Sequence, residues 1–198
     1  MENKFVDLLH ELESFLRKSH YSIINKFDDG KQDVEIYEFL KKLNFQARKD
    51  FVELYSWRNG IKGLFQGAAI NQLELFANGI MLPLEYAISL YLLEVKVQNK
   101  FKKYFLPIFT NGGGDYILMN FDSKSKSYGQ LFLYSPSLLM TEDPMSIYDS
   151  LETLFETILF IYKENGYVFK SEVLEVNYEI ENKISRQLNI RSEFWKNE

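Results

Sequence analysis

The chain has 198 residues, of which 46% are hydrophobic and 16% aromatic, so it can bury a full core, which excludes extensive disorder. It contains no cysteine, which excludes disulfides, thiolate metal sites and thiol nucleophiles. Its net charge of −5 disfavours nonspecific binding to nucleic acid and favours a basic partner.

The N-terminal region is predicted to form helices. Apolar residues recur at helical spacing over residues 2–18, 34–43 and 47–59, with charges on the opposite faces. Asp33 is placed to cap the second helix, and Asn59-Gly60 is suited to end the third in the left-handed conformation.

A hairpin is predicted next, because Asn78-Gly79 stands between the apolar runs 73–77 and 80–82. Asn-Gly readily takes the positive φ angles of a type I′ turn. Pro83 then fits the first turn of a helix whose apolar residues follow helical spacing to Val95.

Residues 105–135 are predicted to form a three-stranded antiparallel meander. The middle strand, residues 116–121, is apolar on both faces, which is typical of a central strand. Pro107 cannot donate a hydrogen bond to a neighbouring strand and indicates an edge or a bulge in the first strand. Three consecutive glycines, residues 112–114, connect the first two strands.

The last clear helix spans residues 149–164 and is ended by Asn165-Gly166. Beyond it, Val176, Tyr178 and Ile180 alternate as in a strand, whereas Ile180 and later apolar residues step as in a helix. We expect a short strand or coil, followed by a helix to about residue 190.

These elements predict one α+β domain over residues 1–198, with a twisted, mostly antiparallel sheet flanked by helices. Its core is expected at about residues 47–165, with N-terminal helices over 2–43 and a C-terminal extension over 167–198. The first residues carry acids where a signal peptide would be apolar, and the apolar runs are too short or too charged to cross a bilayer. We therefore expect a cytoplasmic protein without membrane contact.

The glycine turn has two interpretations. Its backbone could cradle an anion, but a P-loop or a dinucleotide fingerprint requires glycines that open a helix, and here they connect two strands. No Lys or Arg lies within the turn. We therefore predict a structural turn, in which Asp115 bonds local backbone rather than acting as a metal ligand or general base.

No motif for catalysis or for a cofactor is found. The two histidines, His10 and His20, belong to no His-acid cluster, and no Gly-x-Ser-x-Gly elbow occurs. The acidic pairs Glu152/Glu156 and Glu142/Asp143 are interpreted as solvated surface charge. We therefore expect no metal, no cofactor and no enzymatic activity.

Aromatic residues are abundant, with 13 Tyr and 17 Phe. Tyrosine is enriched at protein interfaces because it supplies a large contact area at a low entropic cost. Two alternatives stay open for the four tyrosines of the meander, which lie either exposed on the sheet or packed beneath the helices: Tyr104, Tyr116, Tyr128 and Tyr134.

The chain resembles the SUKH superfamily, which includes fungal SMI/KNR-type cell-wall-assembly regulators and many bacterial immunity proteins. The resemblance rests on three blocks within about residues 47–165: a helix ending in Phe51-Val-Glu-Leu-Tyr-Ser-Trp-Arg-Asn-Gly60, the glycine-rich meander, and the amphipathic helix that follows it. Family members commonly carry Leu-Pro at the entry of the first of these helices, where this chain has Phe45-Gln46.

The resemblance implies binding rather than catalysis. Bacterial members typically neutralise cognate toxins, often nucleases, and an acidic domain suits a basic toxin because opposite charges speed association. We therefore expect a stoichiometric toxin inhibitor that is a monomer or a weak dimer. Turn placement and charge select its candidate partner-binding residues: Asp115, Tyr116, Tyr128, Glu142 and Asp143.

Two alternatives stay open beside the immunity protein. One is a non-catalytic interaction or scaffold module in signalling, which the fungal relatives suggest. The other is a small-ligand-binding protein or phosphoester enzyme that uses the glycine turn.

Overall fold

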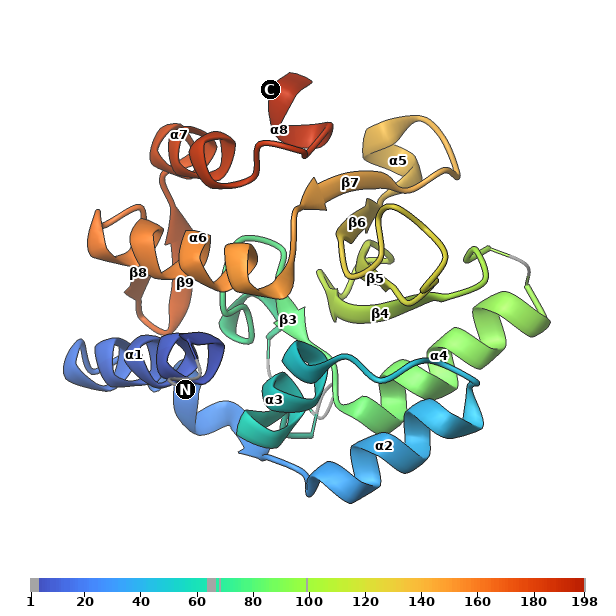
Figure 1. The fold of residues 1–198 in the computed structure, drawn as a ribbon. Helices are drawn as coiled ribbons and strands as arrows, with labels where there is room; N and C mark the ends of the chain where they lie inside the picture. Colours follow the sequence, from blue (N-terminus) through green and yellow to red (C-terminus); the bar gives the residue numbers. More distant parts are fainter. Residues whose placement is uncertain (1–3, 64–66, 68, 99, 198) are drawn as a thin grey trace.

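The centre of the structure is a five-stranded antiparallel sheet (Figure 1). The computed structural model describes residues 4–63, 67, 69–98 and 100–197. The strand order is β3-β4-β5-β6-β7, and the strands are β3 (Ile80–Met81), β4 (Phe105–Thr110), β5 (Tyr116–Asn120), β6 (Leu131–Tyr134) and β7 (Met145–Tyr148). The predicted meander is therefore confirmed as β4-β5-β6, with β5 central.

Pro107 marks a bulge rather than an edge. The pairing of β4 with β5 shifts register between Pro107 and Phe109. On its other side, β4 pairs with β3 only around Phe109 and Thr110, and the Leu82 N–H donates to the Ile108 carbonyl at 2.9 Å. Pro107 lies beyond this short pairing, so its missing N–H costs no hydrogen bond to β3.

The N-terminal helices agree with the predictions except at their ends. The helices are α1 (Lys4–Lys18), α2 (Asp33–Lys42) and α3 (Lys49–Trp57); residues 2 and 3 lie outside the described residues. The capping prediction for Asp33 is wrong, because the N-cap is Gln32, whose N–H donates to the Glu35 carboxylate at 3.1 Å. Asp33 instead accepts a hydrogen bond from the Ser56 hydroxyl at 2.6 Å.

The predicted left-handed stop at Asn59-Gly60 is also wrong. Helix α3 ends at Trp57, and the chain continues directly into β2 (Arg58–Ile61). Strand β2 pairs with β1 (Phe27–Asp29), which follows the 3-10 helix η1 (Ser22–Lys26) in the chain. Gly60 does have a positive φ of 73°, but within the strand. A Cβ there would lie 2.4 Å from the Leu82 carbonyl carbon, so the close approach of two backbones requires glycine.

The predicted hairpin over residues 73–82 is only partly present. Asn78 has the expected positive φ of 59°, and a bridge joins Phe76 to Gly79. Residues 73–77 form no strand; they follow the 3-10 helix η2 (Ile70–Gln72), and β3 pairs with β4 instead. Pairing with a longer, buried strand prevails over the local hairpin.

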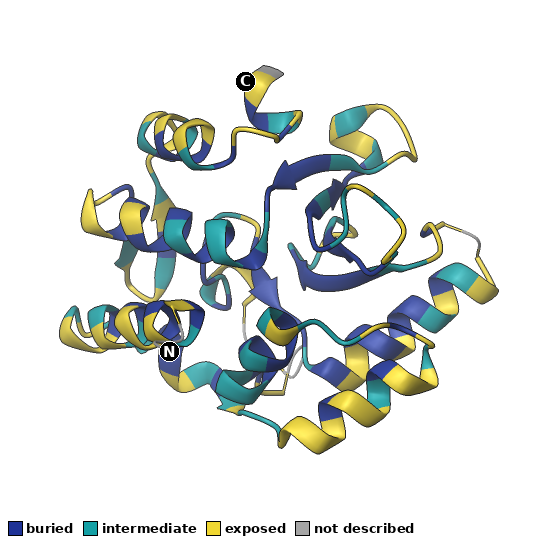
Figure 2. Cartoon of the chain, viewed as in Figure 1, coloured by how far each residue is buried: buried dark blue, intermediate teal, exposed yellow. Residues whose placement is uncertain are grey.

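Helices cover both faces of the sheet. The main ones are α4 (Leu84–Lys96) and α6 (Leu151–Lys163), and the short helix α5 (Pro136–Leu139) lies in the connection between β6 and β7. Ile117 and Met119 of β5 belong to the main core with α1, α3 and α6, whereas Leu118 belongs to a smaller cluster with α4. This division follows from the alternation of side chains along a strand. Strands and helix faces that meet in the core are buried (Figure 2).

The C-terminal extension holds more structure than predicted. A hairpin of β8 (Tyr167–Lys170) and β9 (Val173–Val176) precedes α7 (Tyr178–Leu188) and α8 (Phe194–Asn197). Asn165 ends α6 with a φ of 57°, as predicted. Helices α7 and α8 lie beside the β7 end of the sheet (Figure 1).

The predicted fold class, a single α+β domain with antiparallel sheets, is confirmed. Within the described ranges, every helix is too short or too polar to pass through a lipid bilayer.

Candidate binding cleft

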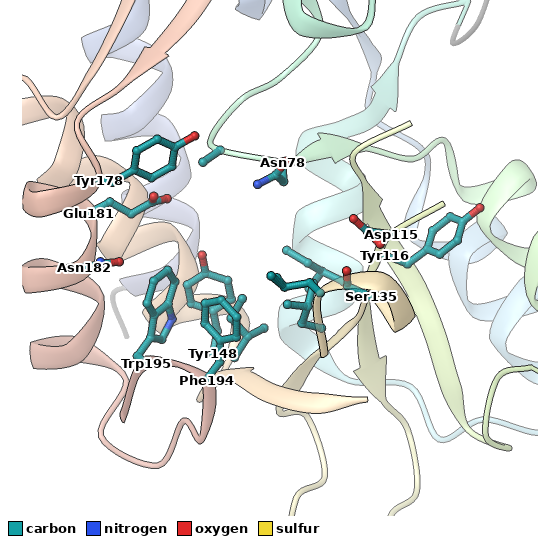
Figure 3. Close-up of a pocket in the computed structure, with 15 residues that line it drawn as sticks. Asn78, Asp115, Tyr116, Ser135, Tyr148, Tyr178, Glu181, Asn182, Phe194 and Trp195 are labelled. Atoms are coloured by element: carbon teal, nitrogen blue, oxygen red, sulfur yellow. The ribbon is translucent and has the colours of Figure 1, made fainter. Parts of the chain in front are cut away.

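A cleft of about 440 Å³ opens between one end of the central sheet and the C-terminal helices (Figure 3). One wall comes from the ends of β5, β6 and β7 and the turn before β5, and the other from α7 and α8. The two walls are distant in sequence, so the cleft exists only in the folded chain.

The sheet wall has an apolar floor and a polar rim. Ile117 and Leu133 are paired across β5 and β6 and line the cleft together with Ile147 of β7. Asp115, in the β4–β5 turn, lies at the rim, and Ser135 follows the end of β6. Strand pairing therefore fixes this wall.

The C-terminal wall is one face of a helix and two aromatic rings. Tyr178, Glu181 and Asn182 are spaced at i, i+3 and i+4, which places them on one side of α7. Phe194 and Trp195 of α8 complete the wall, and their rings meet edge to face at 4.9 Å.

Side-chain hydrogen bonds attach the C-terminal segment to the sheet. The Arg191 N–H donates to the Asp149 carboxylate at 3.2 Å, and the Ser192 hydroxyl donates to the Ser146 carbonyl at 3.1 Å. Asn189 accepts from the Asp149 N–H at 3.2 Å and donates to the Thr157 hydroxyl at 3.0 Å. These bonds fix the position of α8 and therefore of Trp195.

Both charged groups that line the cleft are carboxyls, Asp115 and Glu181. Glu181 is 5% exposed and accepts a hydrogen bond from the Tyr167 hydroxyl. Burial raises the pKa of Glu181 to about 7, although the bond from Tyr167 acts in the opposite direction. Among the described residues, neither carboxyl is in an ion pair.

Two buried polar atoms of the cleft lining have no hydrogen-bond partner among the described residues. They are the hydroxyl oxygen of Ser135, which is 1% exposed, and the indole nitrogen of Trp195, which is 5% exposed. An unsatisfied buried polar group costs about 1–3 kcal/mol, so a ligand that pairs with it gains stability.

The glycines form a turn between two strands, as the sequence predicts, but the Asp115 carboxylate bonds the Asn111 side chain rather than local backbone. The Asn111 side-chain oxygen accepts from the Gly113 and Asp115 N–H groups at 2.7 and 3.1 Å, and the Thr110 hydroxyl accepts from the Gly112 N–H at 3.0 Å. Asn111 also donates to the Asp115 carboxylate at 2.7 Å. The position that an anion would take is filled by the turn's own side chain.

The predicted partner-binding residues divide between the two ends of the sheet. Asp115 and Tyr116 lie at the cleft end, although the Tyr116 ring points away from the cleft and packs on Phe101 at 5.4 Å (Figure 3). Tyr128 lies in the loop after the other end of β5, beneath the Arg48 guanidinium at 4.7 Å.

Glu142 and Asp143 lie in the connection between β6 and β7, at the cleft end. Glu142 accepts a hydrogen bond from the Tyr134 hydroxyl, and Asp143 pairs with Lys102 at 2.7 Å. Tyr134 is buried, whereas Tyr104, Tyr116 and Tyr128 are half-buried, so neither alternative for these tyrosines holds for all four.

The other acidic pair of the sequence analysis, Glu152/Glu156, binds Lys4 on the surface. Within the described part of the chain, no three His, Asp or Glu side chains come together as a metal site would require.

Sequence reasoning missed the C-terminal wall. Glu181 falls on the polar side of the helical pattern set by Ile180, Ile184 and Leu188, which indicates solvent rather than burial. Trp195 is one of only two tryptophans and follows Phe194 in a mostly polar tail, and this aromatic pair was the available signal.

A family model described as the SMI1 / KNR4 family (SUKH-1) matches residues 32–157. Among curated proteins, none matches the sequence. The matched range includes α2 and the whole central sheet, whereas Tyr178, Glu181, Asn182, Phe194 and Trp195 lie beyond it.

Proposed function

Because the chain belongs to the SMI1 / KNR4 family (SUKH-1), we propose that it is an immunity protein that binds a cognate bacterial toxin and blocks it stoichiometrically. The family match over residues 32–157 carries this proposal. The proposed role is binding rather than turnover, in the cytoplasm of the cell that the chain protects.

The cleft end of the sheet supports a role in binding. It combines an apolar floor, exposed apolar side chains at Leu138 and Tyr178, and the carboxyl groups of Asp115 and Glu181. An apolar concavity with a few polar groups is typical of a recognition site. We propose that Asp115, Tyr116, Glu142 and Asp143, which lie in or beside the connections at this end of the sheet, belong to the toxin-binding face.

The charge of the chain supports a basic toxin. The net charge is −5, and the carboxyls of the cleft add a local negative potential where the partner would dock. Opposite charges raise association rates, and this effect decreases with ionic strength. A basic nuclease is the toxin class that fits this charge.

Co-expression tests the proposal. The product of the adjacent gene is expressed in a sensitive host with and without this chain, and we expect growth only when both are present. Purified proteins should then form a 1:1 complex, measured by titration calorimetry. Loss of protection, together with no complex, would contradict the proposal and favour the interaction module in signalling.

A further inference from the structure

The two carboxyls of the cleft come from opposite walls. Figure 3 shows Asp115 on the sheet side and Glu181 on the α7 side, with the cleft between them. The lining residues of the described chain include no Lys, Arg or His that could neutralise either group. Burying an ionised carboxyl without a positively charged partner costs free energy, and a cation placed between the walls would reduce that cost.

The mouth of the cleft suits a long side chain. Tyr178 is 63% exposed and Leu138 is 60% exposed, and both line the cleft. Arginine and lysine pack their aliphatic stems along such apolar surfaces while the charged group reaches polar partners. The aromatic rings of Tyr178 and Trp195 offer cation–π contacts in addition.

The unpartnered polar atoms favour a peptide over a free cation. The Trp195 indole can only donate a hydrogen bond, and the Ser135 hydroxyl can donate one, so both suit a carbonyl oxygen. A peptide segment supplies backbone carbonyls next to its side chain. The lining therefore offers acceptors for a cation and donors for the adjoining backbone.

We propose that the cleft binds an arginine or lysine side chain, together with the backbone beside it, from a loop of the partner protein. This inference rests on the proposed function and names the feature of the toxin that this chain recognises. The basic group lies between Asp115 and Glu181, and a backbone carbonyl accepts from Trp195.

The position of the cleft gives it a role in specificity. Asp115 and Ser135 lie within the family-matched range, whereas Glu181 and Trp195 lie beyond it. The family core thus supplies one half of the recognition site, and the C-terminal extension supplies the half that adapts it to one toxin.

A peptide library tests the inference without the toxin. Random heptapeptides displayed on phage are selected on the full-length chain at pH 8, where Glu181 is ionised. We expect the enriched peptides to share one Arg or Lys flanked by apolar residues. Replacing that residue by citrulline or norleucine should weaken binding at least tenfold, measured by titration calorimetry.

Variants assign the contacts. Asp115→Asn and Glu181→Gln should each weaken the selected peptide about tenfold, and Trp195→Phe, which keeps the ring but removes the donor, about threefold. Glu179→Gln is the matched control, because Glu179 is an exposed carboxylate of the same helix outside the cleft lining, and it should bind as the unmodified chain does. Thermal unfolding confirms that each variant is folded.

The inference would be overturned by no enriched peptide, by enriched peptides without a basic residue, or by equal binding of the selected peptide to Glu181→Gln and to the unmodified chain. Free arginine that competes as strongly as the peptide would also overturn it, because the backbone contacts would then contribute nothing. Protection from the toxin that survives both carboxyl substitutions would leave the proposed function intact but remove this site from it. Peptide binding by a chain that gives no protection from the toxin would keep the cleft as a binding site but contradict the proposed function.

Discussion

The two walls of the cleft share one hydrophobic core but differ in the hydrogen bonds that hold them. The sheet wall is part of the central ladder, and its strands pack on α6, whose Leu151, Leu154 and Phe155 are fully buried. The C-terminal wall is held by the burial of Ile184 and Trp195 in the same main core and, in addition, by side-chain hydrogen bonds of residues 189–193 to β7 and its neighbours. A change in the first wall disturbs the strand ladder and the core, whereas an exposed residue of the second wall, such as Tyr178, can change without repacking the sheet.

The largest expected effect tests whether the sheet side carries the stability. Phe155 is fully buried and its ring contacts those of Phe5, Trp57 and Phe109. Phe155→Ala should lower the free energy of unfolding by about 3–5 kcal/mol, measured by urea denaturation. Phe155→Leu, which keeps most of the volume, should cost less than half of that. A loss below about 1 kcal/mol would contradict that role of the sheet side.

A pH-dependent effect on stability tests the environment of Glu181 in the C-terminal wall. The folded pKa is raised from 4.5 to about 7, so the folded chain binds the proton more tightly than the unfolded chain. This contribution to stability is full below pH 4.5 and is lost as the pH rises to about 7, a change on the order of 3 kcal/mol.

Glu181→Gln should remove that pH dependence while keeping an acceptor for the Tyr167 hydroxyl. Urea denaturation between pH 4.5 and 8 measures the unfolding free energy of both proteins. At pH 8 the variant should be more stable than the unmodified chain. Tyr148 and Tyr167 also adjoin Glu181, but burial raises the pKa of both, so they stay neutral over this range. Parallel curves of unfolding free energy against pH for the two proteins would show that Glu181 is ionised over this whole range.

A smaller effect concerns the attachment of the C-terminal wall. Asp149→Asn keeps the shape of the side chain but removes the charge that the Arg191 backbone and guanidinium contact. We expect a loss of about 1–2 kcal/mol in unfolding free energy and a severalfold weaker affinity for the selected peptide. Glu11→Gln, in an exposed ion pair with Lys163 outside the cleft lining, is the control and should cost less than about 0.5 kcal/mol. Equal effects of the two variants would show that this attachment is not needed.

The smallest effect separates the two ends of the sheet. Tyr128→Phe removes a hydroxyl that donates to the Gln46 carbonyl at 3.3 Å, in an exposed position, and keeps the ring under Arg48. Stability should change by less than about 0.5 kcal/mol, and protection from the toxin should be unaltered in the co-expression assay. A loss of protection would move the interface away from the cleft, to the opposite end of β5.

The elements that the sequence predicts well are those whose determinants are local. Helix α6 combines a continuous apolar stripe with a cap, in which the Ser150 hydroxyl accepts from the Thr153 N–H at 3.1 Å. The partner of β3 depends on residues about 30 positions away, so the local turn at Asn78 suggested the wrong pairing. The β8–β9 hairpin turns at Ser171 and Glu172, with φ of 49° and 67°, and neither residue is a typical signal for that conformation.

Among the residues that line the cleft, only Asp115 and Tyr116 were predicted from the sequence to bind a partner. Asp115 was found because it belongs to a recognisable turn. Glu181 was missed because its burial is a tertiary effect: the polar face of α7 covers the end of the sheet instead of facing water. Amphipathicity assigns a helix face to the core or to solvent, and it does not distinguish a solvent face from the wall of a cleft.

The Asn111 side chain, which fills the glycine turn, also has a kinetic consequence. Because Asn111 bonds the Gly113 and Asp115 N–H groups and the Asp115 carboxylate, Asp115 is held in position before any partner arrives. Association then requires no ordering of this loop, and the conformational entropy that a flexible loop would lose is lost already during folding. An inhibitor that must capture a toxin before it reaches its target gains from such preorganisation, since the rate of capture is then limited by diffusion and charge.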